Sequence, residues 1–158
     1  MSTQTIGWIG TGTMGLPMCG HLLSAGYSLA VNSRTRSKAE RLLSQGAQWC
    51  ETPAEVARRS TTIFTMVGKP EEVSAVYFSD DGIFSGLQAD TVVVDMGTTP
   101  PSMSAEIAHR ATELNAHAVD APVSGGDVGA RNATLSIMVG GDEAVVESVR
   151  PMFECMAK

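Results

Sequence analysis

The chain alternates between two kinds of hydrophobic pattern from one end to the other. Short, continuous apolar runs are typical of buried strands, and the segments between them carry apolar residues at every third or fourth position, as on one face of a helix. This alternation predicts an α/β fold of the Rossmann type, a doubly wound, mainly parallel sheet with helices on both faces. The predicted strands cover residues 5–9, 28–31, 61–67, 91–95, 117–121 and 135–139.

Local signals predict where several helices begin. Thr52-Pro53-Ala54-Glu55 is a capping box with proline at the first helical position, Pro70 begins another helix, and Asp142 is placed to cap the last one. Residues 79–86 and the glycine-rich stretch 125–129 are predicted as turns and loops. The chain contains no linker, repeat or low-complexity segment, so we expect one domain over residues 1–158.

The first predicted strand leads into a glycine-rich turn, Gly10-Thr11-Gly12-Thr13-Met14-Gly15, which opens a segment of helical spacing. In a dinucleotide fold the first glycine permits the tight turn, the second leaves room for a pyrophosphate, and the third lets helix and strand pack closely. The helix then points free N–H groups and its positive dipole end at the anion. A purely structural turn is the alternative, but the flanking strand and helix favour phosphate binding.

The loop after the second strand should contact the adenosine, because ligands of such sheets bind beyond the carboxyl ends of the strands. It has no acidic residue of the kind that holds the ribose hydroxyls in NAD enzymes. Asn32 can bond a hydroxyl, and the Arg34 guanidinium matches a phosphate, which predicts NADP rather than NAD. A solvated arginine-rich turn is the alternative. Neighbours that could assist are Ser33, Thr35, Arg36 and Lys38.

Two further loops at the same edge are expected near the nicotinamide half of the cofactor. Met66-Val67-Gly68 follows a buried strand and could line the channel for the ribose, with Glu72 in the next helical turn as a hydroxyl partner. The loop after Asp95 offers two hydroxyls, Thr98 and Thr99, and one of them is expected to cap the following helix.

The segment Ser124-Gly125-Gly126 is a candidate carboxylate site, because a hydroxyl and successive glycine amides make a small anion-binding nest. An ordinary Ser-Gly-Gly loop is the alternative. No histidine lies near Ser124 in the sequence and no G-x-S-x-G elbow surrounds it, so a hydrolase nucleophile is not predicted. The three histidines lack ligand spacing, and no metal site is predicted.

The charge and cysteine content of the chain exclude several classes of binding partner. Eleven basic and seventeen acidic residues give a net charge of −6 without a block of like charge, which argues against nucleic acid or an anionic membrane. Cys19, Cys50 and Cys155 are odd in number and far apart, as expected for reduced thiols. The N-terminal segment 1–4 shows no leader, and no run approaches the roughly 18 apolar residues of a membrane span. We therefore expect a soluble, cytoplasmic protein.

Four segments, in order, resemble the β-hydroxyacid dehydrogenases: residues 6–18, 32–35, 119–126 and 136–142. That family includes 3-hydroxyisobutyrate dehydrogenase, tartronate semialdehyde reductase, glyoxylate/succinic semialdehyde reductase and, more distantly, 6-phosphogluconate dehydrogenase. The resemblance implies that the chain is the family's N-terminal NAD(P)-binding domain. It also implies cofactor contacts at Gly10, Gly12, Met14, Gly15, Asn32, Arg34, Thr35, Val67 and Thr98, and a substrate carboxylate at Ser124, Gly125 and Gly126.

The resemblance further implies that catalytic parts lie outside this sequence. In the family, a catalytic lysine stands on a long helix after this domain, and a second, helical domain closes the active site. The chain stops at Lys158, which stands too early to replace that lysine. No catalytic residue is therefore expected in the chain, since reducing a carbonyl by hydride transfer also needs a proton donor.

Two functions follow from these observations. The first is an NADP-dependent oxidoreductase that interconverts a short β-hydroxyacid and its semialdehyde or ketone. When intact it would be a homo-oligomer, and its own C-terminal domain would pack against this one. The second is a stand-alone NADP-binding scaffold or sensor without catalysis.

Overall fold

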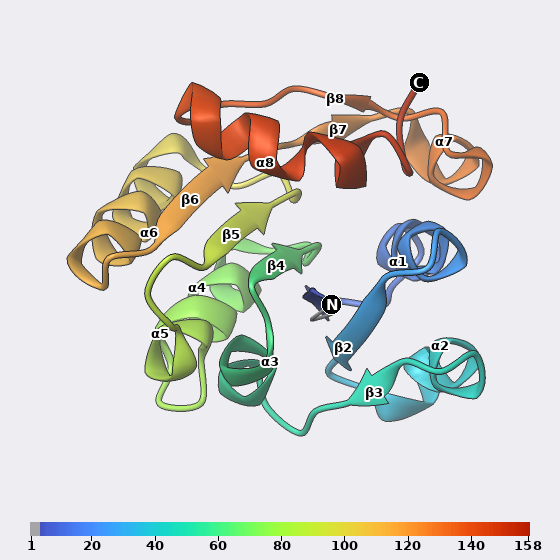
Figure 1. The fold of residues 1–158 in the computed structure, drawn as a ribbon, viewed down its shortest axis with the longest axis horizontal. Helices are drawn as coiled ribbons and strands as arrows, with labels where there is room; N and C mark the ends of the chain where they lie inside the picture. The colour runs from blue at the N-terminus through green and yellow to red at the C-terminus, as the bar shows by residue number, and fades with distance from the viewer. Residues whose placement is uncertain (1–3) are drawn as a thin grey trace.

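A computed structural model describes residues 4–158, so the first three residues of the segment examined above for a leader lie outside the described residues. Six parallel strands form the central sheet in the order β3-β2-β1-β4-β5-β6 (Figure 1). The chain winds outward from β1 to β3 and then returns to β4, so the order reverses between β1 and β4. This is the predicted Rossmann-type topology. The strands are β1 (Thr5–Ile9), β2 (Ser28–Asn32), β3 (Gln48–Trp49), β4 (Thr62–Thr65), β5 (Val92–Asp95) and β6 (His117–Asp120).

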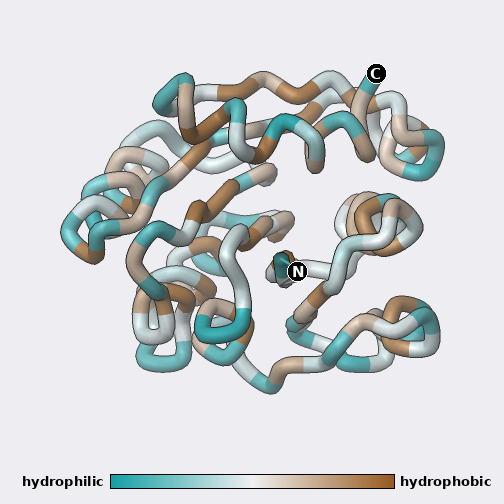
Figure 2. Tube along the Cα trace, in the orientation of Figure 1, coloured by the Kyte–Doolittle hydropathy of each residue, from teal (hydrophilic) through white to brown (hydrophobic). Residues whose placement is uncertain are grey.

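Helices cover both faces of this sheet, as the sequence predicts. Alternate strand residues face opposite sides, so Ile6 and Trp8 pack with α1, α2 and α8, and Ile9 and Ile63 pack with α3, α4, α5 and α6. Figure 2 shows the hydrophobic stretches along the strands and the hydrophilic ones at the periphery. The helices are α1 (Gly15–Ser24), η1 (Arg36–Ala39), α2 (Glu40–Ser44), α3 (Pro53–Arg59), α4 (Pro70–Phe78), α5 (Ile83–Gly86), α6 (Pro101–Glu113), α7 (Gly126–Asn132) and α8 (Glu143–Phe153).

The predicted helix starts are confirmed where a cap defines them. Helix α3 begins at Pro53, and the Thr52 hydroxyl accepts a hydrogen bond from the Glu55 amide at 3.1 Å. Helix α4 begins at Pro70. Helix α8 begins after Asp142, whose carboxylate accepts from the Val145 amide at 3.2 Å.

Three predictions for irregular or terminal segments are wrong, and packing explains each. The turn-rich stretch 79–86 contains α5, which buries Ile83 and packs closely on α3. The predicted loop 125–129 instead begins α7, because buried Gly129 lies against Leu135 and outweighs the low helix propensity of glycine. The predicted strand 135–139 shrinks to β8 (Ser136–Ile137), which pairs antiparallel with β7 (Val123–Ser124) outside the main sheet. The short strand β3 was not predicted.

Helix α1 begins at Gly15 in close contact with the residue that follows β1. A Cβ atom there would lie 1.9 Å from the Gly10 carbonyl oxygen and 3.3 Å from Trp8 Nε1. That carbonyl oxygen also accepts a hydrogen bond from Trp8 Nε1 at 2.8 Å, so it is not free to move away. Gly20, in the same helix, has no atom within 4 Å of an added Cβ.

These two glycines give a matched pair of substitutions. Gly15→Ala forces backbone apart in a packed region, so we expect it to lower the free energy of unfolding by about 1–3 kcal/mol. Gly20→Ala should raise it by up to about 1 kcal/mol, because alanine is the better helix former and space is available. Denaturant titration measures both, and similar effects at the two positions would contradict the close approach at Gly15.

Candidate cofactor site

The loops that follow β1, β2, β4 and β5 meet at the carboxyl edge of the sheet. The Gly10 amide donates to the Asn32 carbonyl at 3.0 Å, and the Met66 amide donates to the Ile9 carbonyl at 2.9 Å. Gly10 has a φ of +105°, and a Cβ there would lie 2.2 Å from the Met66 carbonyl oxygen, so only glycine fits between these loops. The structure thus brings together the segments that the sequence singled out along the chain.

The turn after β1 presents free donors to solvent. Within residues 4–158, the backbone N–H groups of Gly12, Thr13, Met14 and Gly15 donate no hydrogen bond. The Thr11 side chain is buried, and its hydroxyl finds no partner among the described residues. Gly12 has no atom within 4 Å of an added Cβ, so the space beside it is open. Free amides, an orphaned hydroxyl and open space are what a bound pyrophosphate would use.

A cavity of about 390 Å³ lies between Gly10, the loop after β2 and helix α4. Four apolar side chains line it together with six polar or charged residues, a mixture that is usual where a pocket orients a ligand. Asn32 is buried there and its amide nitrogen donates to the Cys50 carbonyl at 2.9 Å, which leaves its side-chain oxygen for a ligand. The lining residues are Ile9, Gly10, Asn32, Ser33, Arg34, Pro53, Glu71, Glu72, Ala75, Val76 and Ser79.

Arg34 and Glu72, both predicted as site residues, form an ion pair with each other across this cavity. The Arg34 side chain is 77% exposed and that of Glu72 is 29% exposed. The second oxygen of Glu72 accepts from the amides of Gly68 and Lys69 at 3.2 and 3.4 Å. The hydrogen bond from Arg34, followed by those from the backbone, lowers the pKa of Glu72. Sequence patterns gave no signal for this pairing, because Arg34, in the loop after β2, and Glu72, in α4, come together only in the folded structure.

The other basic residues named with Arg34 behave differently. Arg36 lies over the Trp49 ring at 5.6 Å and within 3.9 Å of Glu51, so its charge already has partners in the described structure. Lys38 instead lines a second cavity of about 510 Å³ directly above the turn. That cavity is bordered by Thr11, Gly12, Thr13, Leu16, Ser37, Lys38, Glu40 and Arg41.

The loop after β5 is held by a buried carboxylate. Asp95 accepts hydrogen bonds from the Thr65 hydroxyl at 3.2 Å, from the Gly97 amide at 3.1 Å and from the Thr99 hydroxyl. Burial raises the pKa of Asp95. The expectation that Thr98 or Thr99 caps α6 is wrong: the N-cap is Pro100, and the Thr99 hydroxyl is bonded to Asp95 instead.

Ser124, Gly125 and Gly126 lie where β7 ends and α7 begins, and all three are exposed. Ser124 pairs with Ser136 in the small antiparallel sheet, so the segment is held in place rather than free. Gly125 and Gly126 both have positive φ, +134° and +62°, and their amides donate no hydrogen bond within residues 4–158. The predicted nest therefore has unused N–H donors.

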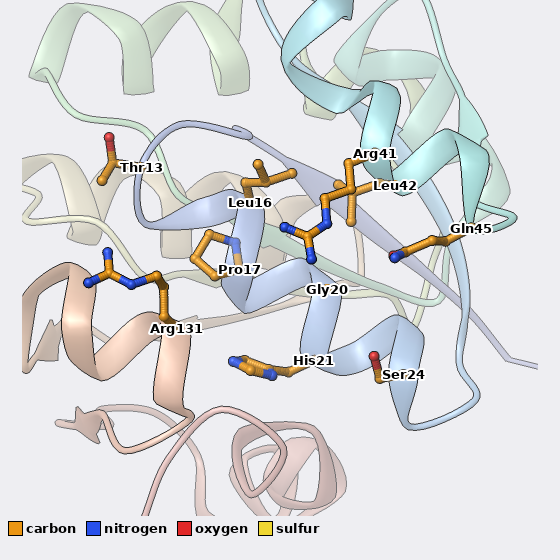
Figure 3. Close-up of a pocket in the computed structure, with 10 residues that line it drawn as sticks. All are labelled: Thr13, Leu16, Pro17, Gly20, His21, Ser24, Arg41, Leu42, Gln45 and Arg131. Atoms are coloured by element: carbon orange, nitrogen blue, oxygen red, sulfur yellow. The ribbon is translucent and has the colours of Figure 1, made fainter.

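A third cavity, of about 450 Å³, lies between α1, α2 and α7 and was not predicted (Figure 3). It adjoins the glycine turn through Thr13 and Leu16. His21, Arg41 and Arg131 border it from three different helices. His21 Nε2 lies 2.7 Å from the Ala130 carbonyl oxygen, a contact that ties α1 to α7 and keeps this histidine in a structural role.

Metal-binding clusters, disulfide bonds and membrane-spanning helices are absent from the described residues. Between residues 4 and 158, no cluster of three or more His, Cys, Asp or Glu side chains could hold a metal ion. All three cysteines are free thiols. No helix in the described part of the chain has the length and apolar character needed to cross a membrane.

Comparison with known proteins identifies relatives of the whole chain. Residues 5–158 match the family model described as the NAD binding domain of 6-phosphogluconate dehydrogenase. The Arabidopsis thaliana protein named probable 3-hydroxyisobutyrate dehydrogenase-like 1, mitochondrial, is 49% identical over 99% of the chain and 47% of its own length. The 2-hydroxy-3-oxopropionate reductase of Escherichia coli is 43% identical over 97% of the chain and 52% of its own length. The chain therefore spans about half the length of these curated relatives.

A solved structure shows the same arrangement. Psf3 in complex with NADP+ and 2-OPP superposes with a TM-score of 0.91 at 31% sequence identity. The match covers 96% of this chain and 54% of that one. The order of strands and helices described above is thus shared over nearly the full chain.

The Asp95 network gives a test of how the carboxyl edge is held. Replacing Asp95 by alanine leaves three donors in or near the core without their acceptor, so we expect the free energy of unfolding to fall by about 1–3 kcal/mol. Asp95→Asn keeps one acceptor oxygen and should cost less.

Comparing wild type with Asp95→Asn also tests the charge state of the Asp95 carboxyl group. Because burial raises the pKa of Asp95 above its ordinary value of 3.8, the folded state binds more protons at Asp95 than the unfolded state between the two pKa values. Stability from this group therefore falls as the pH rises through that window. In denaturant titrations from about pH 4 to about pH 7, the free energy of unfolding of wild type should exceed that of Asp95→Asn by the largest amount at the acidic end. A pH-independent difference would contradict this assignment.

Proposed function

The chain belongs to the family of the NAD-binding domain of 6-phosphogluconate dehydrogenase, as the N-terminal domain of a β-hydroxyacid dehydrogenase, and from this we propose that it binds NADP. One observation carries the proposal: the turn whose four amides at residues 12–15 donate no hydrogen bond within residues 4–158 begins at Gly10, which lines the same cavity as Arg34. Backbone donors suit a pyrophosphate, and a guanidinium suits the additional 2′-phosphate of NADP.

Each part of the cofactor has residues that would hold it. The free amides of residues 12–15, with the Thr11 hydroxyl, would bind the pyrophosphate, and Gly10 and Gly15 would permit the tight turn. Asn32, Ser33, Arg34 and Thr35 would bind the adenosine and its 2′-phosphate. Met66, Val67, Gly68 and Thr98 would line the nicotinamide ribose. When bound, the cofactor supplies the hydride or accepts it.

We further propose that the intact protein interconverts a short β-hydroxyacid and its semialdehyde or ketone. The nest at Ser124, Gly125 and Gly126 would hold the substrate carboxylate through its free amides. The names of the relatives, which include a 2-hydroxy-3-oxopropionate reductase, support this substrate class. The proton donor for the reduced carbonyl would come from a second domain, which also accounts for relatives of twice the length.

Exposed apolar side chains support a second domain that covers this part of the molecule. Three of the large hydrophobic residues that are exposed in the described structure belong to the segments that follow the Ser124–Gly126 nest: Val128 in α7, and Met138 and Val139 directly after β8, which pairs with β7. Such a grouping is typical of a surface that packs against another domain or subunit. A homo-oligomer of the intact enzyme fits the same observation.

A cytoplasmic location also remains part of the proposal. The three free thiols fit a reducing compartment, whereas the name of the Arabidopsis relative places that protein in mitochondria. Fractionation of cells that express the tagged full-length protein would decide between the two.

Arg34→Ala tests the choice of cofactor. Loss of a charge-assisted contact to the 2′-phosphate should weaken NADP binding at least about tenfold and change NAD binding by less than about twofold. Calorimetric titration of the 158-residue chain with each dinucleotide measures both. Arg110→Ala, on the exposed side of α6, serves as the control and should change neither. Equal losses for NADP and NAD in Arg34→Ala would overturn the 2′-phosphate assignment.

A turnover assay tests whether this domain alone can carry out the proposed reaction. The 158-residue chain supplied with NADP and short β-hydroxyacids should show no measurable hydride transfer, because none of its residues is placed to accept the proton that the hydroxyl loses on oxidation. The absorbance of reduced nicotinamide provides the readout. Measurable turnover would mean that the proton acceptor lies within this chain.

A further inference from the structure

We propose that Glu72 limits the preference of this site for NADP. In this view, which rests on the proposed function, the Glu72 carboxylate competes with the 2′-phosphate for Arg34 and accepts the ribose 2′-hydroxyl when the cofactor is NAD. Glu72 would thus act as the acidic residue that is missing from the end of β2, delivered to the same cavity from α4.

The contacts of Arg34 and Glu72 leave the Arg34 side chain freer to move than the Glu72 side chain. Glu72 stands in the first turn of α4, and one of its oxygens accepts from the Gly68 and Lys69 amides, so it is fixed to the backbone of the loop after β4. Arg34 is 77% exposed, and its only side-chain hydrogen bond within residues 4–158 goes to Glu72. When a ligand binds, the guanidinium is therefore the group that can reorient, and the carboxylate stays.

Among the residues that line the cavity, only Arg34 can pair with both the Glu72 carboxylate and a 2′-phosphate. Glu71 and Glu72 both line the cavity, and Arg34 is the single basic residue on its wall. Arg36, two residues away, is directed to Trp49 and Glu51. A 2′-phosphate entering here must share or displace the Glu72 contact and also approach a fixed carboxylate, which costs free energy. A ribose 2′-hydroxyl has no such cost, because it can donate to the carboxylate.

Glu72 is also charged when this competition matters. The hydrogen bond from Arg34 lowers its pKa, so the carboxylate is ionised at neutral pH in the free protein. Binding of NADP would remove that stabilising contact and leave the negative charge facing the phosphate.

The experiment compares dinucleotide binding by wild type, Glu72→Gln and a matched control, Glu71→Gln. Glu71 precedes Glu72 in α4 and lines the same cavity, but it makes no ion pair within residues 4–158. Glu72→Gln removes the charge and keeps an oxygen for the Gly68 and Lys69 amides. We expect it to tighten NADP binding about threefold to fivefold, the range of an exposed ion pair, and to weaken NAD binding by about threefold. Glu71→Gln should move the NADP-to-NAD ratio by less than about twofold.

A double-mutant cycle isolates the competition. In an Arg34→Gln background, the gain in NADP affinity from Glu72→Gln should be smaller than in the wild-type background, because the contested guanidinium is gone and only the repulsion between carboxylate and phosphate remains to be relieved. If thermal unfolding shows that Glu72→Gln disturbs the start of α4, Glu72→Asp provides a second variant. It keeps the charge near the loop amides, withdraws it from Arg34, and should shift the ratio in the same direction.

The outcomes separate this proposal from the one on which it rests. An unchanged NADP-to-NAD ratio in both Glu72 variants, or equal changes for the two cofactors, would overturn the role of Glu72. Failure of the wild-type chain to bind either dinucleotide, or an Arg34→Ala variant with undiminished NADP affinity, would instead overturn the proposed function.

Discussion

The contact between the Gly10 carbonyl and the first residue of α1 is the constraint on which the site depends. A side chain at Gly15 would place its Cβ 1.9 Å from that oxygen, and one at Gly10 would lie 2.2 Å from the Met66 carbonyl oxygen. The two glycines let β1, α1 and the loop after β4 converge within the reach of one ligand. Because α1 begins so close to the sheet, its first amides point into the crevice where the strand order reverses.

The two ends of the proposed cofactor site differ in the groups that would form them. The phosphate end would consist of backbone amides held by the turn and its buried neighbours, so little would need to move when an anion binds. The adenosine end would depend on Arg34, a long and exposed side chain already paired with Glu72. A rigid backbone cradle gives affinity for any dinucleotide, whereas exposed, paired charges set the difference between dinucleotides.

Sequence patterns predicted the parts of the fold that depend on local signals. Continuous apolar runs located the main strands, and caps such as Thr52 and Asp142 located helix starts, because these interactions span a few residues. They failed where distant packing decides. Gly129 is helical because it lies against Leu135, and residues 135–139 leave the main sheet because β8 pairs with Ser124 and its neighbour. The sequence did not reveal the Arg34–Glu72 pair either, since each residue was predicted as a site residue without its partner.

The structure around Ser124 argues for a site shared between domains. The segment is pinned by pairing with Ser136, yet its glycine amides are unused and its surface is exposed. Exposed Val128 lies in α7, and exposed Met138 and Val139 directly follow β8, which pairs with β7. A carboxylate held there in open water would gain little, because water competes for each hydrogen bond. Covering the segment with a second apolar surface would exclude that water, strengthen the binding of the carboxylate, and bring a proton donor to a carbonyl beside the nicotinamide.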